Sequence, residues 1–250
     1  MNNIPIKTQQ ELNDMRIGGA ILKEVLDKMY DVVKPGISTM EIDLIAEKII
    51  RAHEGATPGF KGYSGFPATL CISINEEVVH GIPKEDRFLK EGDIVGLDCG
   101  VLYKGLYTDA CRTYLVGKVK PEVQKFVEIT KKALNDCLKK VRPGNHIGDI
   151  SEVIEDVLTS NGYSPVIECT GHGVGHNLHE PPEILNAGRK GTGPEIKPGM
   201  VFAIEPISTM GYGNIVTGDD DWTIITADNS LSAHFEHTVI VTEDGYEVIV

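Results

Sequence analysis

The sequence has few of the features that mark secreted, membrane-bound or nucleic-acid-binding chains. Its five cysteines are odd in number and include no CxxC pair, which argues against a disulfide framework and fits a reducing compartment. No stretch approaches the roughly 20 apolar residues of a membrane span. The first residues contain no apolar core of signal-peptide length. We therefore expect a cytoplasmic protein without a membrane partner.

Positive charge is also scarce. The formal net charge of −13 argues against a nucleic-acid-binding surface, which is normally basic. Hydrophobic residues make up 41% and charged residues 24%, which is ordinary for a globular protein. We interpret the acidic run of residues 219–221 as a solvated loop.

An internal repeat organises the chain. Residues 15–50 align without gaps with residues 123–158, at an offset of 108. In each copy a helical pattern ends at a Pro-Gly turn and a second amphipathic helix follows. In the first copy Thr39, with Ser38 beside it, is the expected N-cap, and Ser38-x-x-Glu41 has the form of a capping box.

A second match extends the repeat into strands. Residues 89–98 pair with residues 196–205, so that Asp98 aligns with Glu205. A chance match of helix-turn-strand patterns is the alternative. We expect an α/β (α+β) fold in which a pseudo-two-fold antiparallel sheet carries helices on its outer face. After an N-terminal arm of residues 1–10, one domain (11–250) would consist of two halves, about 11–120 and 121–250.

Five residues of metal-binding type, four carboxylates and one imidazole, lie in segments that read as strands or strand ends: Asp98, Asp109, His172, Glu205 and Glu236. An oxygen-rich ligand set is typical of sites for manganese, iron or cobalt, whereas structural zinc sites are rich in thiolates. Five ligands are too many for one tetrahedral ion but suit two ions that share carboxylates. Two metals about 3.5–4 Å apart activate water in aminopeptidases and phosphatases.

Two of these acids flank a predicted hairpin. A turn near Tyr103-Lys104 would place Asp98 directly opposite Asp109, with Cβ atoms roughly 4.5–5.5 Å apart. Two charges this close repel by roughly 4 kcal/mol at an effective dielectric constant near 20, so an inward-facing pair calls for a cation. Two solvated hairpin acids are the alternative, and the apolar neighbours of Asp98 favour burial.

The glycine-rich segment around His172 is predicted to be extended, because three glycines argue against a helix. An extended backbone of this kind can approach a metal or a substrate closely. We expect His172 to be a ligand, His179 to contact substrate, and His176 to be a bystander. Pro181 and Pro182 are expected to end the strand.

The predicted strand over residues 232–242 puts Glu236 on one face with His234 and Thr238. A lone glutamate in a strand usually faces solvent, so its candidacy depends on the other four residues. His80 has a setting like that of His179, since each is followed within three residues by proline. We expect these two imidazoles to face each other across a cleft, where they suit acid–base work or substrate binding.

The chain resembles the type I methionine aminopeptidases of the short bacterial form. The resemblance spans nearly the whole sequence and is carried by residues 63–83, 92–117, 171–186, 197–206 and 230–242. It implies the pita-bread fold and removal of N-terminal methionine from nascent proteins and peptides with a small second residue. It also implies a cytoplasmic monomer, with the ribosome as a further partner.

The resemblance assigns roles to particular residues. The five metal-type residues would hold two divalent ions (cobalt, manganese, iron or zinc), bridged by Asp109 and Glu236. Glu205 would also be the general base, and His80 and His179 would contact the substrate and stabilise the tetrahedral intermediate. The methionine pocket would be formed by Phe66, Cys71 and Trp222, with Tyr63 and Phe60 nearby.

One departure concerns the pocket rim, where some family members carry a histidine at the place of Ser64. Three rival functions stay open: a proline-specific aminopeptidase or dipeptidase of the same fold, a non-catalytic binding protein, and a mononuclear iron oxygenase. The proline-specific enzymes usually have an additional N-terminal domain. A binding protein would be expected to lose ligands, and an oxygenase would leave two acids unexplained.

Overall fold

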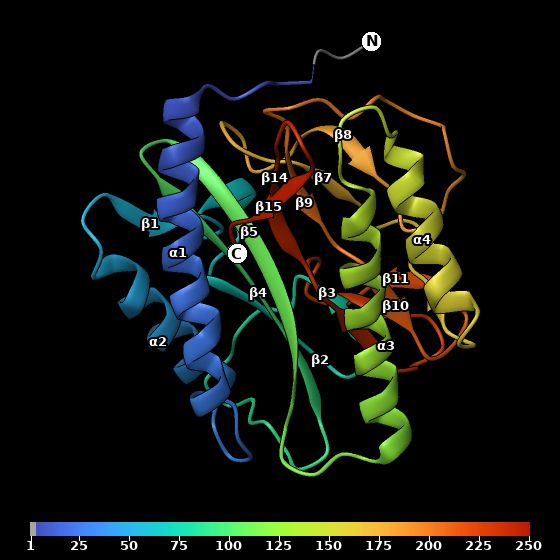
Figure 1. Ribbon diagram of the computed structural model, residues 1–250. Coiled ribbons are helices and arrows are strands. Elements are labelled where there is room, and N and C mark those ends of the chain that lie inside the picture. Colours follow the sequence, from blue (N-terminus) through green and yellow to red (C-terminus); the bar gives the residue numbers. More distant parts are fainter. Residues whose placement is uncertain (1–3) are drawn as a thin grey trace.

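A computed structural model describes residues 4–250 of the chain. Two helix pairs occupy corresponding places in the two halves of the sequence, as Figure 1 shows. The helices of the described part are α1 (Gln9–Val32), α2 (Thr39–Arg51), α3 (Pro121–Cys137) and α4 (Ile147–Thr159), with short 3-10 turns η1 (Tyr63–Gly65) and η2 (Leu138–Lys140). Residues 1–3 of the expected N-terminal arm (1–10) lie outside the described residues. The last two residues of that arm belong to helix α1, which begins at Gln9.

The helix starts follow from local sequence. Thr8 and Glu11 form a capping box at α1, and Ser38 and Glu41 form one at α2. Ser38 is therefore the N-cap, and the expectation of Thr39 was wrong by one residue. Thr39 is the first helical residue, and its hydroxyl instead donates to the Lys84 carbonyl oxygen at 3.0 Å.

The first half contributes a four-stranded antiparallel sheet in which β5 runs along one edge of β4, and β1 and β2 pair with successive stretches of its other edge. The strands are β1 (Ala56–Pro58), β2 (Leu70–Ile74), β4 (Ile94–Tyr103) and β5 (Leu106–Leu115). Lys104 and Gly105 form the hairpin turn with φ angles of 49° and 80°, the conformation that two-residue hairpins favour.

The second half contributes a five-stranded sheet in the order β15-β14-β9-β7-β8. Its strands are β7 (Gly171–Gly173), β8 (Glu180–Ile184), β9 (Val201–Ile204), β14 (His237–Val241) and β15 (Tyr246–Val248). Pro181 and Pro182 were expected to end the strand that carries His172, but that strand, β7, already ends at Gly173, and the two prolines lie inside the next strand, β8. The sheet tolerates them because β8 is the outermost strand of this order, where ladder donors are dispensable.

Two smaller sheets complete the described topology. One has the order β11-β12-β3 and therefore joins the first half to the second. The other has the order β13-β10-β6. Their strands are β3 (Glu77–Val79), β11 (Ile215–Thr217), β12 (Ile224–Thr226), β6 (Ser164–Pro165), β10 (Ile207–Thr209) and β13 (Ser232–His234).

The two halves meet where β5 lies against β14. The Thr238 hydroxyl accepts from the Asp109 backbone N–H at 2.9 Å and donates to the Asp109 carbonyl at 2.6 Å. Glu236 donates its backbone N–H to the Cys111 carbonyl at 2.9 Å. The predicted continuous strand over 232–242 is interrupted at residues 235–236, so that β13 and β14 belong to different sheets. The interruption places Glu236 at the junction of the halves.

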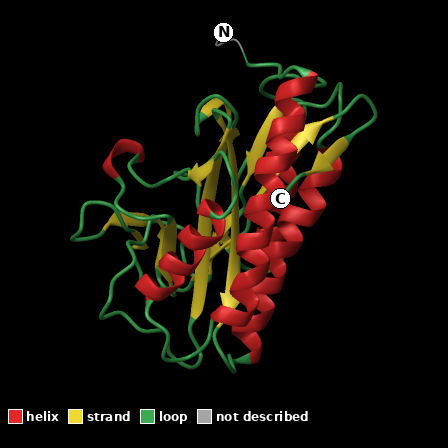
Figure 2. Cartoon of the chain, turned by 90° about the vertical axis from the view of Figure 1, so that its left-hand side faces the viewer, coloured by secondary structure: helices red, strands yellow, loops and turns green. Residues whose placement is uncertain are grey.

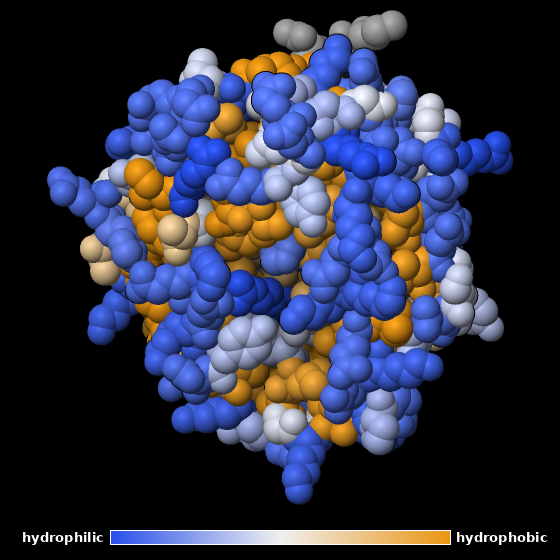
Figure 3. All heavy atoms as spheres, viewed as in Figure 1, coloured by the Kyte–Doolittle hydropathy of each residue, from blue (hydrophilic) through white to orange (hydrophobic). Residues whose placement is uncertain are grey.

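The long helices gather on one side of the strands, as Figure 2 shows. Each half has its own apolar cluster beneath its helices, for example Leu22, Met29 and Ile42 in the first and Phe126 and Ile150 in the second. Burying each such side chain contributes roughly 1.5–3 kcal/mol. On the helix-bearing face, hydrophilic residues predominate and apolar patches are scattered among them (Figure 3).

Candidate metal centre

A cavity of about 370 Å³ lies on the strand side of the molecule, between the two halves. All five metal-type residues of the sequence line it, together with both predicted substrate-contacting histidines. The other lining residues are Phe60, Tyr63, Ser64, Phe66, Cys71, Val79, Leu178, Trp222 and His234. Residues from distant parts of the chain therefore converge on one site.

Asp98 and Asp109 come from the β4–β5 hairpin, but they do not face each other directly. Asp98 pairs with Cys111, and Asp109 pairs with Gly100. The turn is centred one residue later than predicted, on Lys104 and Gly105, which moves each partner by two positions. The two acids are therefore diagonal neighbours on the same face, and diagonal pairs lie within reach of each other's side chains.

His172 is oriented by its own backbone. Its Nδ1 lies 2.9 Å from the Gly173 carbonyl oxygen, which can only accept, so Nδ1 carries the proton. Nε2 then presents its lone pair to the cavity, 3.6 Å from Glu205 Oε1 and 3.9 Å from Asp109 Oδ2. A hydrogen bond at one ring nitrogen that leaves the other free is the usual arrangement of a metal-binding histidine.

Three residues form the most compact group: ligand-type atoms of Asp109, His172 and Glu236 all lie within 4.8 Å of one another, and all three residues are buried. Asp98 and Glu205 border the same cavity without belonging to this group, and the Glu205 side chain keeps 11% of its surface exposed. The buried oxygens Asp98 Oδ1, Asp109 Oδ1 and Glu236 Oε1 have no hydrogen-bond partner within residues 4–250. Unpaired buried carboxylate oxygens are costly, and divalent cations would satisfy them.

The electrostatics lead to the same interpretation. Burial raises the pKa of Asp98 to about 7. Burial, with the negative charge of Glu236 and then Asp98, raises the pKa of Asp109 well above its ordinary value. The pKa values of Glu205 and Glu236 are raised in the same way. Burial also lowers the pKa of His172 to about 4, so its imidazole is neutral near pH 7. The donor set therefore fits hard or borderline divalent cations, which bind ionised carboxylates and neutral imidazoles.

His80 and His179 approach the cavity from opposite halves, after β3 and before β8 respectively, and both remain accessible to it. His80 has a φ angle of 62°, which is uncommon for a residue other than glycine and turns the backbone sharply at this point. His179 lies beside His172 with ring centroids 4.4 Å apart, and its Nδ1 is 3.3 Å from the Tyr63 hydroxyl. Desolvation by the protein lowers the pKa of both rings.

Aromatic and sulfur-bearing side chains line one end of the cavity. The rings of Phe66 and Trp222 meet edge to face, with centroids 5.3 Å apart. Cys71 pairs with Asp98 across β2 and β4, and its buried thiol has a raised pKa. Phe60 and Leu178 pack into the same cluster. Leu178 was missed from the sequence, although it directly precedes His179.

Three further residues bear on the predictions. His176 is half-exposed and lies 2.9 Å from Glu11, away from the cavity lining. Ser64 lies at the rim with a φ angle of 48°. Asp220 of the acidic run caps a tight turn, because its carboxylate accepts from the backbone N–H groups of Trp222 and Thr223. This carboxylate thus helps to hold Trp222 beside the cavity.

His234 is the titratable residue of the cavity lining that the sequence predictions missed. It lies beside Glu205 and Glu236, is 5% exposed, and its Nε2 is buried without a hydrogen-bond partner in the described chain. The signal was present, since His234 precedes Glu236 by two residues and was expected to share its face. Burial, with the other imidazoles, lowers the pKa of His234 to about 3.

The chain matches the model of metallopeptidase family M24 over residues 13–243. It is 46% identical over 246 residues to a methionine aminopeptidase of Clostridium perfringens (strain 13 / Type A), covering 98% of both chains. It is 40% identical to a methionine aminopeptidase of Escherichia coli (strain K12), covering 98% of this chain and 93% of that one. The crystal structure of methionine aminopeptidase from Rickettsia prowazekii superimposes with a TM-score of 0.96 and 41% identity over 99% of each chain. The predicted pita-bread fold is confirmed by this likeness. Within residues 4–250, each helix is too short or too polar to cross a membrane.

Proposed function

We propose, from the premise that this chain belongs to metallopeptidase family M24, that it acts as a methionine aminopeptidase. The reaction would be hydrolysis of the peptide bond after an N-terminal methionine, in peptides and nascent proteins whose second residue is small. One observation carries the assignment: four acids and one neutral imidazole converge beside an apolar slot that could hold a methionine side chain.

Two divalent cations are proposed at the acidic end of the cavity, held by Asp98, Asp109, His172, Glu205 and Glu236. Asp109 and Glu236 lie in the compact group and are the proposed bridging residues. Manganese, iron, cobalt and zinc all suit these donors. When bound, such cations lower the pKa of a water molecule and polarise a carbonyl oxygen.

Glu205 is the proposed general base. Its carboxylate would accept a proton from the attacking water and deliver it to the nitrogen of the leaving amine. Its exposed fraction is larger than that of Asp109 or Glu236, and this gives it access to the cavity where substrate would lie. A positioned group of this kind contributes typically 10²–10⁴-fold to the rate.

His80 and His179 are the proposed contacts to the scissile amide and to the charge that develops on its carbonyl oxygen. Both reach the cavity from outside the compact group, and neither is fully buried. Tyr63 would assist His179. If its hydroxyl donates to Nδ1, then Nε2 carries the ring proton and can donate to a substrate oxygen.

The apolar slot is the proposed methionine site. Phe66, Cys71 and Trp222 offer aromatic edges and a thiol, which make favourable contacts with a flexible thioether. Partners beyond the peptide N-terminus, including the ribosome, and a monomeric state are further proposals. So is a cytoplasmic location, which the five unpaired cysteines support.

The test combines metal titration with peptide release. The metal-loaded protein should release methionine from Met-Ala peptides and bind two equivalents of Mn²⁺ or Co²⁺. Release from Xaa-Pro peptides instead would favour the proline-specific rival. Binding of two ions without any peptide release would favour a binding protein. Binding of only one equivalent of metal would contradict the two-metal proposal.

A further inference from the structure

We propose that His234 is a positioning residue for Glu205, holding the carboxylate at Oε2 through a hydrogen bond from its Nε2–H. The inference rests on the role proposed above for Glu205 at the metal centre. It adds a polar residue to the metal centre, beyond the four acids and one imidazole that the sequence identified.

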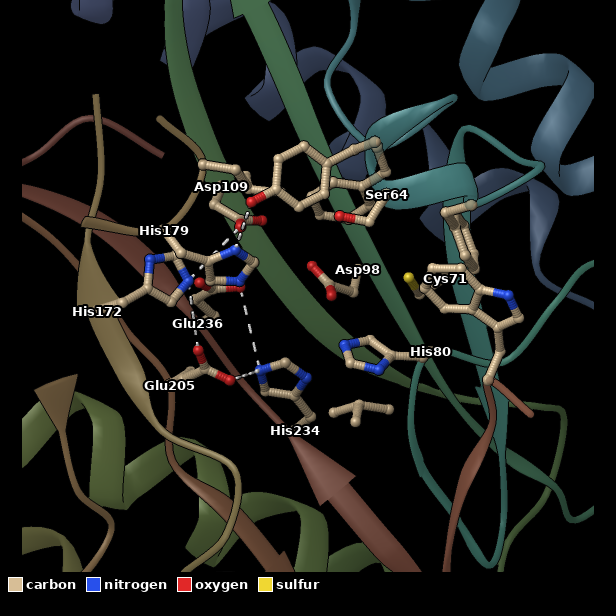
Figure 4. Close-up of a pocket in the computed structure, with 16 residues that line it drawn as sticks. Ser64, Cys71, His80, Asp98, Asp109, His172, His179, Glu205, His234 and Glu236 are labelled. Atoms are coloured by element: carbon tan, nitrogen blue, oxygen red, sulfur yellow. Dashed lines mark hydrogen bonds and ion pairs between the residues drawn. The ribbon is translucent and has the colours of Figure 1, made fainter. Parts of the chain in front are cut away.

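The contacts around Glu205 carry the inference. The two carboxylate oxygens of Glu205 lie between two imidazoles: His172 Nε2 is 3.6 Å from Oε1, and His234 Nε2 is 3.4 Å from Oε2. Figure 4 shows the two rings on either side of this carboxylate. His172 has its proton on Nδ1, so its Nε2 is an acceptor or a metal ligand and cannot hold Glu205 by a hydrogen bond. A donor at Oε2 must therefore come from another group, and His234 is the group within reach.

The backbone of His234 is held firmly by the opposite half of the molecule. Its N–H donates to the Thr113 hydroxyl at 2.9 Å, and the same hydroxyl donates to its carbonyl at 2.8 Å. Its ring is 5% exposed and has little freedom to turn away. Nε2 is buried, and nothing in the described chain completes its hydrogen bond. A buried polar atom without a hydrogen-bond partner is destabilising, so a small rotation of Glu205 toward it is favoured.

The contacts of His234 favour a positioning role over a direct ligand role. Its Nε2 is 3.4 Å from Glu205 Oε2 and 4.0 Å from Glu236 Oε2, so it faces two carboxylates that are themselves proposed ligands. A ring that binds the outer oxygen of a ligating carboxylate fixes how that carboxylate is presented, and losing such a partner typically costs 10–100-fold in metal affinity or activity.

The test compares His234→Gln with His234→Leu and His234→Asn. The glutamine amide nitrogen reaches the place of Nε2, whereas leucine has no donor and the shorter asparagine amide reaches only the place of Nδ1. We expect the leucine and asparagine variants to lose about 10–100-fold in kcat and in Co²⁺ affinity. The glutamine variant should stay within about threefold of the wild type on both measures.

The visible absorption spectrum of the Co²⁺-loaded protein gives a readout that is independent of turnover. It should shift in His234→Leu and return in His234→Gln, because it reports how the carboxylates surround the ion. His237→Gln is the matched control: His237 lies on β14, the next strand along the chain, and its ring contacts the Val250 carbonyl at 2.8 Å, so the variant should leave the spectrum unchanged.

Two results would overturn the inference. Unchanged kcat, affinity and spectrum in His234→Leu would mean that the ring only fills space. Loss of one whole metal equivalent in all three variants would make His234 a ligand. If the wild type releases methionine from no peptide, the proposed function fails, and the Co²⁺ affinities and spectra still decide the role of His234. If His234→Leu does not fold, the comparison of the glutamine and asparagine variants decides it.

Discussion

Lys7 and Glu180 form an ion pair of 2.6 Å in which the two side chains are only 1% and 3% exposed. The pair joins the segment before α1 to the first residue of β8, immediately after His179. Glu180 also accepts from the Asn177 backbone N–H, so the ion pair braces the turn between β7 and β8. The hairpin that supplies His172 and His179 is thus fastened to the beginning of the chain.

The first prediction breaks this pair. Lys7→Met should lower the free energy of unfolding by about 3–5 kcal/mol, because it leaves the Glu180 carboxylate buried without a counter-charge. The double variant Lys7→Met, Glu180→Leu should recover most of the loss. Urea unfolding measures the free energy of unfolding of the single and the double variant. Lys23→Met removes an exposed pair with Asp27 and should cost less than about 1 kcal/mol. Equal losses in Lys7→Met and Lys23→Met would contradict the bracing role.

The second prediction concerns proton transfer. Glu205→Gln should keep the fold and much of the metal binding while kcat falls by about 10²–10⁴-fold. Steady-state kinetics with metal analysis of the same samples gives the answer. Glu183→Gln, at an exposed site on β8, is the control and should stay near the wild type. A near-normal kcat with the metals bound would remove Glu205 from the proposed role.

The third prediction concerns metal removal and pH. Without cations, the pKa values of four site carboxylates are raised: Asp98 to about 7, and Asp109, Glu205 and Glu236 also upward. In the unfolded chain these groups titrate near pH 4, and histidines near 6.5. At about pH 6.5 the histidines of the unfolded chain are still half protonated, which opposes the carboxyl effect. Above about pH 7.5 the histidines are neutral in both states, while the folded protein still binds more carboxyl protons than the unfolded chain. The stability of the chelated protein should therefore fall as the pH rises from about 7.5.

Bound cations should reverse this trend, since they favour the ionised carboxylates. A cation at a hundred times its dissociation constant adds about 2.7 kcal/mol to the free energy of unfolding. The difference in this free energy between the metal-loaded and the chelated protein should therefore widen as the pH rises. Thermal unfolding with Mn²⁺ and with a chelator, between about pH 7.5 and 8.5, measures this difference in stability. A gap that narrows as the pH rises would show that these carboxylates do not hold the ions.

The fourth prediction separates binding from catalysis at His179. His179→Ala should lower kcat more than it raises KM, because a contact to developing charge is made mainly in the transition state. His176→Ala, on the same hairpin but paired with Glu11 outside the cavity, is the matched control. A large rise in KM with an unchanged kcat would make His179 a simple binding residue.

The fifth prediction concerns the apolar slot. Peptides with N-terminal norleucine should be cleaved within about a hundredfold of methionine peptides, since comparable apolar changes cost roughly 1–3 kcal/mol. Valine peptides should be far poorer, because a branched Cβ does not enter a slot between Phe66 and Trp222. Cys71→Ala should relax this preference. Equal kcat/KM values for methionine and valine peptides would place the slot elsewhere.

The repeat and the strand patterns predicted the architecture and the acids and imidazoles of the cavity, whereas the apolar lining was predicted only from the resemblance to the methionine aminopeptidases. The register of the β4–β5 hairpin was wrong because it depends on which two residues adopt positive φ, and Lys104 gives little indication of that. The position of Pro181 and Pro182 depends on which strand is outermost, which the sequence does not reveal.

Two buried polar residues escaped prediction for a related reason. His234 was expected to share a face with Glu236, but its approach to Glu205 depends on how β13 packs against β10 and against Thr113 of β5. Lys7 lies in a polar segment that looked like a free arm, and its burial depends on Glu180, which lies 173 residues away. Contacts between residues so far apart in the sequence are set by tertiary packing, and local sequence periodicity does not reveal them.

The proline pair in β8 has a consequence for the behaviour of the protein at high concentration. An outer strand with a full row of free N–H groups can recruit a strand from another molecule, which is a common first step in aggregation. Successive residues of a strand point their N–H groups to opposite edges, so one of these two consecutive prolines removes a donor from the outer side of β8 and makes it a poorer template. The hairpin that carries His172 and His179 is thereby protected against self-association at the edge where a foreign strand would most readily distort the metal centre.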